Sequence, residues 1–150
     1  MKIKDVLKQK KDNNVYRINS NKTLCNAAKI FTDHRIGSLI VENDDEEIVG
    51  IITEKDILKI CRDRKGDISQ QLVQNAMTPA DDLITISEND QINRAMSLMT
   101  DSRIKHLPVF KENRLVGMVS IGDLVKSMLD KSRKETKRLQ DYISGDYPEE

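Results

Sequence analysis

The chain has 150 residues and no net charge, because 25 lysines and arginines balance 25 aspartates and glutamates. This balance argues against a nucleic-acid-binding protein, which needs a basic surface, and aromatic residues at 3% are too few for base-stacking platforms. Apolar runs are only a few residues long, far short of a membrane span, and the first residues lack the apolar stretch of a signal peptide. Two cysteines are too few for a disulfide framework, so we expect reduced thiols in a cytoplasmic protein.

The first half of the chain alternates between helical and strand periodicity. The pattern predicts, in order, an amphipathic helix over 1–11, a strand over 15–18, a helix beginning near 24, a strand over 37–41, a polar hairpin tip over 43–47, a returning strand over 48–52 and a helix over 54–62. Residues 63–67 read as a polar linker before a short helix from about 68 to 77. Thr78-Pro79 is expected to stop that helix and to begin the second half.

A seven-residue motif occurs twice, at 50–56 and at 117–123. Each copy reads glycine, two apolar residues, a hydroxyl residue, two variable positions and aspartate. The hydroxyl residue ends a strand and can cap the following helix, and the aspartate three positions later completes a weak capping box. The same geometry would also suit a ligand, because helix N-terminal N–H groups attract phosphate and a carboxylate can accept hydrogen bonds from a ribose diol.

The two motifs belong to an internal duplication. A shift of 68 residues gives nine identities in the positions from 18 to 41, and beyond the hairpin tip the offset becomes 67. The repeat is a β-α-β-β-α unit with a sheet of three strands, which is too small to bury a core alone. We therefore predict an α+β fold in which two repeats pack sheet to sheet with pseudo-twofold symmetry.

The predicted division is a first repeat with its N-terminal helix over 1–66, a second repeat over 67–130, and a charged helical extension and tail over 131–150. The helix of the extension is expected to end at Gly145. Its few apolar residues could pack on the partner of a dimer, and a solvated helix remains the alternative.

These features resemble a cystathionine-β-synthase-type (CBS) domain pair, also called a Bateman module. The resemblance rests on the two motifs, on the strand segment 103–109 (Arg-Ile-Lys-His-Leu-Pro-Val) and on the segment 76–79 (Ala-Met-Thr-Pro). It implies an adenosyl nucleotide as regulatory ligand, with AMP, ADP, ATP, S-adenosylmethionine or a dinucleotide left open, a homodimer, and an unidentified regulated protein. From the charge balance, the short apolar runs and the lack of metal-ligand spacing, we expect neither a nucleic acid nor a membrane as partner, and no metal.

The resemblance also assigns roles within two clefts. Asp123 and Asp56 would each bind a ribose diol, with Ser120 and Thr53 on the ribose–phosphate side. Each cleft would also take residues from the other repeat. The cleft of Asp123 would be lined by Tyr16, Ile36, Gly37 and His106, and that of Asp56 by Ile84, Ile104 and Lys105.

The two clefts are not expected to be equal, because His106 is matched by Ser38 in the first repeat. The cleft of Asp123 therefore has a possible phosphate-binding cation from its own repeat, whereas that of Asp56 has only Lys105. We expect the Asp123 cleft to be the tighter site. A hydrogen-bonded edge residue is the alternative role for His106.

Other function classes fit the sequence less well. It contains no Walker loop and no nucleophile elbow, and His34 and His106 do not have metal-ligand spacing, so we do not expect an enzyme. His34 is expected at the surface, at a helix end. The acidic run 44–47 reads as a solvated turn rather than a metal site. The open alternative is a structural dimerisation scaffold with unoccupied clefts, against a regulatory module that acts by ligand-dependent population shift.

Overall fold

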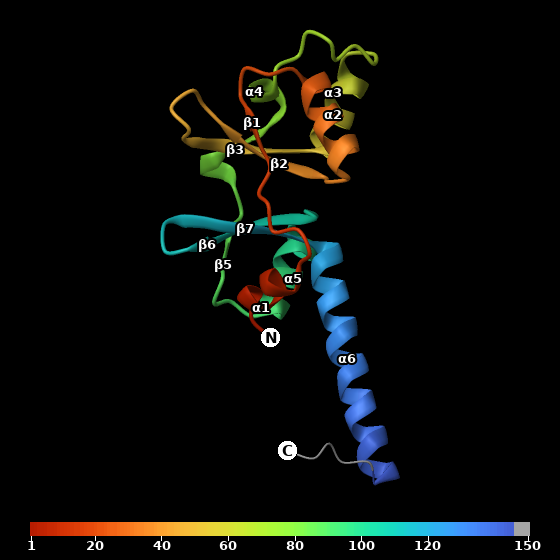
Figure 1. Ribbon diagram of the computed structural model, residues 1–150. Coiled ribbons are helices and arrows are strands. Elements are labelled where there is room, and N and C mark those ends of the chain that lie inside the picture. The colour runs from red at the N-terminus through yellow and green to blue at the C-terminus, as the bar shows by residue number, and fades with distance from the viewer. Residues whose placement is uncertain (146–150) are drawn as a thin grey trace. The chain divides into compact units, whose positions relative to one another are not determined.

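A computed structural model describes residues 1–145 of the chain (Figure 1). The chain forms two compact units. The first-repeat unit comprises Asn14–Ile84. The second-repeat unit comprises Met1–Asn13 together with the chain from Thr85 onward.

The first-repeat unit is a four-stranded sheet with helices packed on it. Its elements are β1 (Arg17–Asn19), α2 (Leu24–His34), β2 (Ser38–Glu42), β3 (Ile48–Thr53), α3 (Glu54–Asp63), α4 (Val73–Ala76), β4 (Thr78–Pro79) and the short 3₁₀ helix η1 (Ala80–Asp82). The strand order is β1-β2-β3-β4, parallel between β1 and β2 and antiparallel elsewhere. The core is aliphatic apart from Phe31, and includes Leu24, Leu39, Val41, Ile52 and Val73.

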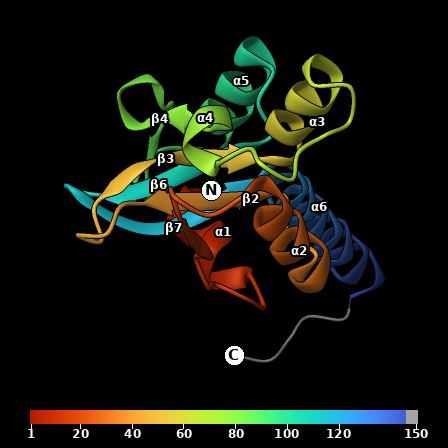
Figure 2. The same cartoon turned by 90° about the horizontal axis from the view of Figure 1, so that it is seen from above.

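The second-repeat unit repeats this plan with three strands. Its elements are α1 (Ile3–Gln9), β5 (Ile86–Ser87), α5 (Ile92–Ser102), β6 (His106–Lys111), β7 (Arg114–Ser120) and α6 (Ile121–Ser144). The strand order is β5-β6-β7, with β5 and β6 parallel and β6 and β7 antiparallel. Helix α1 lies beside β7 (Figure 2) and also contacts α6. The predicted α+β class and the two repeats are confirmed, and the packing of one sheet on the other stays a prediction.

Equivalent helix ends confirm the duplication in detail. Arg35 and Arg103 end α2 and α5 in the left-handed region, with φ of 54° and 53°. After each, an isoleucine N–H donates back to a carbonyl five residues earlier, Ile36 to Phe31 at 3.1 Å and Ile104 to Met99 at 3.0 Å. This is the hydrogen-bond pattern of a Schellman C-cap, formed here around arginine instead of the usual glycine.

Two short segments lie elsewhere than the sequence predicts. The helix expected from about 68 to 77 is only the single turn of α4, and Thr78-Pro79 forms β4, which pairs with β3 in the first-repeat unit. The grouping by contacts therefore differs from the predicted division at 66/67. Residues 67–84 belong with the first repeat and residues 1–13 with the second. The physical reason is that β4 satisfies part of the β3 edge, whose N–H and C=O groups would otherwise be unpaired.

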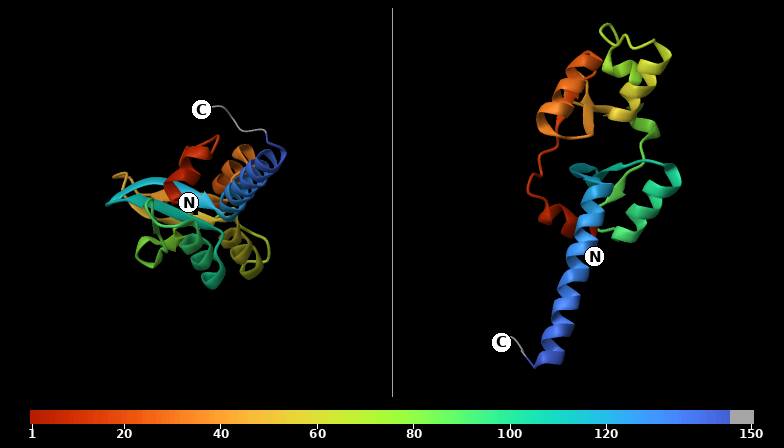
Figure 3. Two further views of the ribbon diagram at one scale, coloured as in Figure 1. Left: turned by 90° about the horizontal axis from the view of Figure 1, so that it is seen from below. Right: turned by 90° about the vertical axis from the view of Figure 1, so that its right-hand side faces the viewer.

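The C-terminal extension continues one helix. Helix α6 runs 24 residues and ends at Gly145, with φ of 78°, as predicted. It extends well beyond the sheet of its own unit (Figure 3). The predicted tail beyond Gly145 lies outside the described residues. Among the described residues, no helix combines the length and apolar character needed to cross a bilayer.

Helices α1 and α4 occupy equivalent positions on their units. Ile3 N–H donates to Asp90 O and Lys4 N–H to Glu88 O, both at 2.9 Å. The matching bonds are Val73 to Lys22 at 2.8 Å and Gln74 to Ser20 at 3.1 Å. The two helices thus dock through equivalent backbone hydrogen bonds. The donor residues of the two helices are 70 positions apart in the chain, and the acceptor residues are 68 apart. The segment before the first repeat therefore packs on the second-repeat unit, and the segment before the second repeat packs on the first-repeat unit.

The motif glycines are the positions where these two docking segments approach the sheets closely. A Cβ at Gly117 would lie 2.7 Å from Leu7 Cδ2, and a Cβ at Gly50 would collide with the Thr78 carbonyl and lie 2.8 Å from Met77 Sδ. Leu7 and Met77 are the equivalent residues of the two docking segments. Both glycines are thus required by close packing rather than by an unusual φ.

Alanine at these glycines should destabilise the protein unequally. Gly50→Ala meets fixed backbone and should lower the free energy of unfolding by about 1–3 kcal/mol, whereas Gly117→Ala meets the movable end of Leu7 and should cost about 1 kcal/mol. Gly122→Ala is the matched control, because its nearest neighbour would be Ser120 Oγ at 3.6 Å and alanine favours a helix. Urea unfolding measures all three, and equal effects at Gly50 and Gly122 would contradict the packing argument.

Candidate functional site

Each motif ends a strand and begins a helix at the residue the sequence predicts. Thr53 ends β3 and Ser120 ends β7, and α3 and α6 begin at the next residue. The Thr53 N–H donates to Asp56 Oδ2 at 2.9 Å, and the Thr53 hydroxyl donates to the same oxygen at 3.2 Å. The Asp56 carboxylate is therefore held in one orientation by its own motif.

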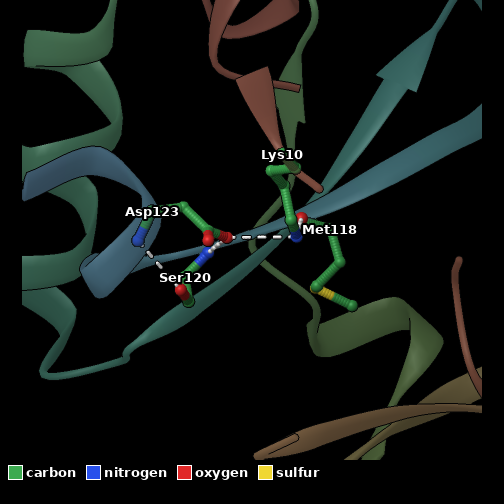
Figure 4. A network of polar contacts seen from close by, with 4 residues as sticks. All are labelled: Lys10, Met118, Ser120 and Asp123. Carbon is green, nitrogen blue, oxygen red and sulfur yellow. Dashed lines mark hydrogen bonds and ion pairs between the residues drawn. The ribbon is translucent and has the colours of Figure 1, made fainter. Parts of the chain in front are cut away.

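The second motif forms a complete capping box. The Ser120 N–H donates to Asp123 Oδ2 at 2.9 Å, and the Asp123 N–H donates to Ser120 Oγ at 3.1 Å. The same Asp123 oxygen lies 3.1 Å from Lys10 Nζ, which also donates to the Met118 carbonyl at 2.8 Å (Figure 4). The Lys10 and Asp123 side chains are 23% and 25% exposed, so this ion pair is accessible to a ligand.

The neighbouring strand adds further predicted residues to each motif. His106 is the strand partner of Ser120, and the Lys105 carbonyl accepts from Ile121 N–H at 2.9 Å. In the first-repeat unit, Ser38 is the partner of Thr53, and the Gly37 carbonyl accepts from Glu54 N–H at 3.3 Å. The structure thus brings His106 and the Lys105 backbone beside Ser120, and the Gly37 backbone beside Thr53, although Lys105 was predicted to line the cleft of Asp56 and Gly37 that of Asp123.

The cross-repeat contacts of the predicted clefts stay predictions. Tyr16, Ile36 and Gly37 lie in the first-repeat unit, whereas Ile104 and Lys105 lie in the second. Within its own unit, the Tyr16 carbonyl accepts from Ile40 N–H at 3.0 Å and the Tyr16 ring lies 4.6 Å from the His34 ring. His34 is exposed and ends α2, as predicted, although its contact with Tyr16 was not expected. Ile84 is half-buried between η1 and β5, in the same unit as Asp56.

Lys10 is the residue that sequence reasoning missed. It is the C-cap of α1, and its partners at 118 and 123 lie more than 100 residues away in the chain. The amphipathic pattern of residues 1–11 predicts a packed helix but does not say which surface it covers. The repeat could have given a signal, because Ile3, Val6 and Leu7 match Val73, Ala76 and Met77 at an offset of 70.

The Asp56 carboxylate of the first motif makes no ion pair within the described residues, and burial has the strongest effect on its pKa. Burial raises the pKa of Asp56, an effect that the two Thr53 hydrogen bonds and the charges of Lys59 and Lys55 only partly oppose. Asp56 thus has a desolvated carboxylate supported by neutral donors. Asp123 has the ammonium of Lys10 in direct contact.

The acidic hairpin tip forms a turn. The N–H groups of Asp45 and Glu47 both donate to Asn43 Oδ1 at 3.0 Å, and Asn19 Nδ2 donates to Asp44 Oδ1 at 2.9 Å. Asn43 thus organises the tip as an Asx turn. In the part of the chain that the structure describes, no three His, Cys, Asp or Glu residues are grouped so as to hold a metal ion.

The two units and their matched motifs define a tandem CBS architecture. The CBS domain family model matches residues 3–63 and 73–130, so the chain belongs to the CBS domain family. A mitochondrial CBS domain-containing protein of Arabidopsis thaliana, CBSX3, is 38% identical over 150 residues, covering 97% of this chain and 73% of the relative.

Two solved structures show the same fold. The CBS-domain containing protein ATU1752 from Agrobacterium tumefaciens is 32% identical with a TM-score of 0.79, over 85% of this chain and 92% of that one. The CBS domain pair of protein MJ0100, solved in complex with methylthioadenosine and S-adenosyl-L-methionine, is 27% identical with a TM-score of 0.70, over 87% and 98%. The family resemblance inferred from the two motifs is confirmed.

The pH dependence of stability should report the Asp56 environment. Because its pKa is raised in the folded state, the folded protein binds the proton more tightly than the unfolded chain. The contribution of Asp56 to the free energy of unfolding therefore falls as pH rises above 3.8 through the raised pKa, and it is regained on acidification. Asp56→Asn removes this dependence, so the stability of the variant relative to wild type should increase from pH 4 to pH 7.

The control for this experiment is Asp63→Asn, which removes an exposed carboxylate from the same helix. Urea unfolding at several pH values compares the two variants with wild type. Parallel curves for Asp56→Asn and wild type would show that burial does not disfavour the charged form of Asp56.

Proposed function

We propose that this CBS pair is a regulatory module that binds an adenosyl nucleotide of the AMP, ADP or ATP type at its motif aspartates. The observation that carries the proposal is the fixed orientation of both carboxylates. In each motif a backbone N–H holds one carboxylate oxygen, Oδ2, before any ligand arrives. A ribose diol needs such an oriented pair of acceptor oxygens, and pre-organisation lowers the entropic cost of binding.

The similarity to the MJ0100 pair supports the ligand class. That protein was solved with two adenosyl compounds, and its fold covers most of this chain. The local chemistry also favours binding over catalysis, because the Ser120 hydroxyl serves as a helix cap that accepts the Asp123 N–H. We therefore propose no enzymatic activity for the chain.

The mechanism we propose is a population shift. The ligand binds one conformation of the pair better than another and can move the equilibrium only by that difference in affinity, typically about 1–3 kcal/mol. The readout is an unidentified regulated protein in the cytoplasm.

A ligand panel tests the proposal. AMP, ADP, ATP, S-adenosylmethionine and methylthioadenosine are added at millimolar concentration, and the melting temperature is measured by differential scanning fluorimetry. At least one ligand should raise it, because binding to the folded state alone stabilises that state. Asp123→Asn should reduce the AMP-induced rise more than Asp56→Asn does, each measured against its own ligand-free value.

Asparagine is chosen because it keeps an acceptor for the capping N–H while removing the carboxylate charge. A panel without any shift in wild type would leave the dimerisation scaffold as the better description. An AMP response that survives both substitutions would place the site elsewhere.

We also propose that the chain forms a homodimer through α6, which would serve either function. Leu139 and Ile143 expose 64% and 84% of their surface, and Val125 and Leu129 expose 42% and 51%. Together with Ser132 and Thr136, these residues are spaced alternately by four and three positions, which is the period of a coiled-coil seam. A second copy of the same helix presents a seam of matching period.

Polar substitution on this seam should dissociate the dimer. The double variant Leu139→Gln, Ile143→Gln keeps helix propensity and net charge but removes two apolar seam positions, so it should be monomeric at concentrations where wild type is dimeric. The control, Lys137→Gln with Asp141→Gln, is also neutral overall and lies on the outer face of the heptad. Sedimentation velocity over a concentration range compares them, and a wild-type monomer throughout would contradict the proposed seam.

A further inference from the structure

Lys10 is placed where a ligand at Asp123 would meet it. Its ammonium is shared between Asp123 Oδ2 at 3.1 Å and the Met118 carbonyl at 2.8 Å. An ammonium group has three N–H donors, so one donor remains beyond these two contacts. With 23% of its side chain exposed, Lys10 can present this donor to a bound molecule without leaving its position.

The base of the Lys10 side chain is firmly held. Helix α1 buries Ile3 and Val6 almost completely, and Leu7 packs on Gly117. Gln9, directly before Lys10, accepts a hydrogen bond from the Ser127 hydroxyl on α6 at 3.0 Å. Lys10 is therefore a fixed part of the Asp123 surroundings and not a freely moving surface lysine.

The first-repeat unit has no counterpart to this lysine. Helix α4 docks there as α1 docks on the second-repeat unit, and the offset of 70 residues places Ala80 where Lys10 would be. The lysines nearest in sequence to Asp56, Lys55 and Lys59, are on α3 itself and make no ion pair with it within the described residues. The two motif aspartates thus differ by one directly bound positive charge.

We propose, resting on the nucleotide-binding function above, that Lys10 makes the Asp123 site selective for adenosyl ligands that carry a phosphate group over adenosyl ligands that carry a sulfonium. Asp123 accepts the ribose hydroxyls, and the Lys10 ammonium donates to a phosphate oxygen of the same ligand. Charge-assisted bonds of this kind are about twice as strong as neutral ones. The cationic sulfonium of S-adenosylmethionine is repelled by the ammonium, so that ligand favours the Asp56 site, which lacks it.

Isothermal titration calorimetry tests this on the full chain carrying Asp56→Asn, so that the Asp123 site is measured alone. The probes are AMP, adenosine and S-adenosylmethionine. Adding Lys10→Met should weaken AMP binding by about tenfold, leave adenosine within about twofold, and tighten S-adenosylmethionine. Lys10→Arg keeps the charge and should retain AMP binding, and Lys8→Met, an exposed lysine on the same helix, should change none of the three.

Each other outcome overturns the proposal in a distinct way. Equal weakening of AMP and adenosine would mean that Lys10 only positions Asp123, and equal tightening would mean that it blocks the site. If melting temperatures show that Lys10→Met is unfolded, Lys10→Gln replaces it, with the same expectation for the ratio of AMP to adenosine affinity. A parent protein that binds none of the three ligands defeats nucleotide binding at the Asp123 site, and a wild-type protein that also binds none defeats the nucleotide-binding function itself. Binding with an unchanged ratio defeats only the role of Lys10.

Discussion

The close approach of a docking helix to a glycine in the sheet is the constraint on which the rest of this structure depends. Leu7 covers Gly117, and Met77 covers Gly50, so closely that neither glycine can carry a side chain without a shift in its neighbour. Each glycine is also the first residue of a motif whose last residue is the candidate ligand-binding aspartate. The glycine thus serves packing and the aspartate is the proposed recognition residue, although both belong to one short sequence pattern. In the second-repeat unit this docking also brings the Lys10 ammonium to the Asp123 carboxylate.

Much of the architecture could be predicted because the sequence is duplicated, so that the pattern of one repeat could be compared with that of the other. Strand ends at Thr53 and Ser120, helix starts one residue later and the stop at Gly145 all follow from local chemistry that involves neighbouring residues. The docking of α1 could not be predicted in the same way. An apolar stripe shows that a helix is buried, but several surfaces of similar polarity could cover it. Strand β4 was missed because two residues carry no periodicity.

The candidate site shows the same division between local and distant information. The motif aspartates and their hydroxyl partners are near in sequence, and their hydrogen bonds follow from the capping pattern. Lys10 is distant in sequence and reaches Asp123 only through the packing of α1. The predicted inequality of the two sites rested on His106, whereas the structure adds a charge difference of a separate origin. Lys10 and Ala80 occupy equivalent positions of the two docking segments. This one difference adds a positive charge beside Asp123, while the backbone hydrogen bonds of the two segments stay equivalent.

Helix α6 joins the proposed binding and assembly features in one rigid element. Asp123 lies in its first turn, and the exposed Leu139 and Ile143 lie near its end, twenty residues or roughly 30 Å away for Ile143. An uninterrupted helix transmits a tilt at one end as a displacement at the other, since its backbone hydrogen bonds resist local bending. A ligand that contacts both Lys10 and Asp123 would act on the first turn of α6 and on its neighbour α1 together. The position of the proposed coiled-coil seam would then depend on occupancy of the Asp123 site, which would provide a physical route from ligand to partner.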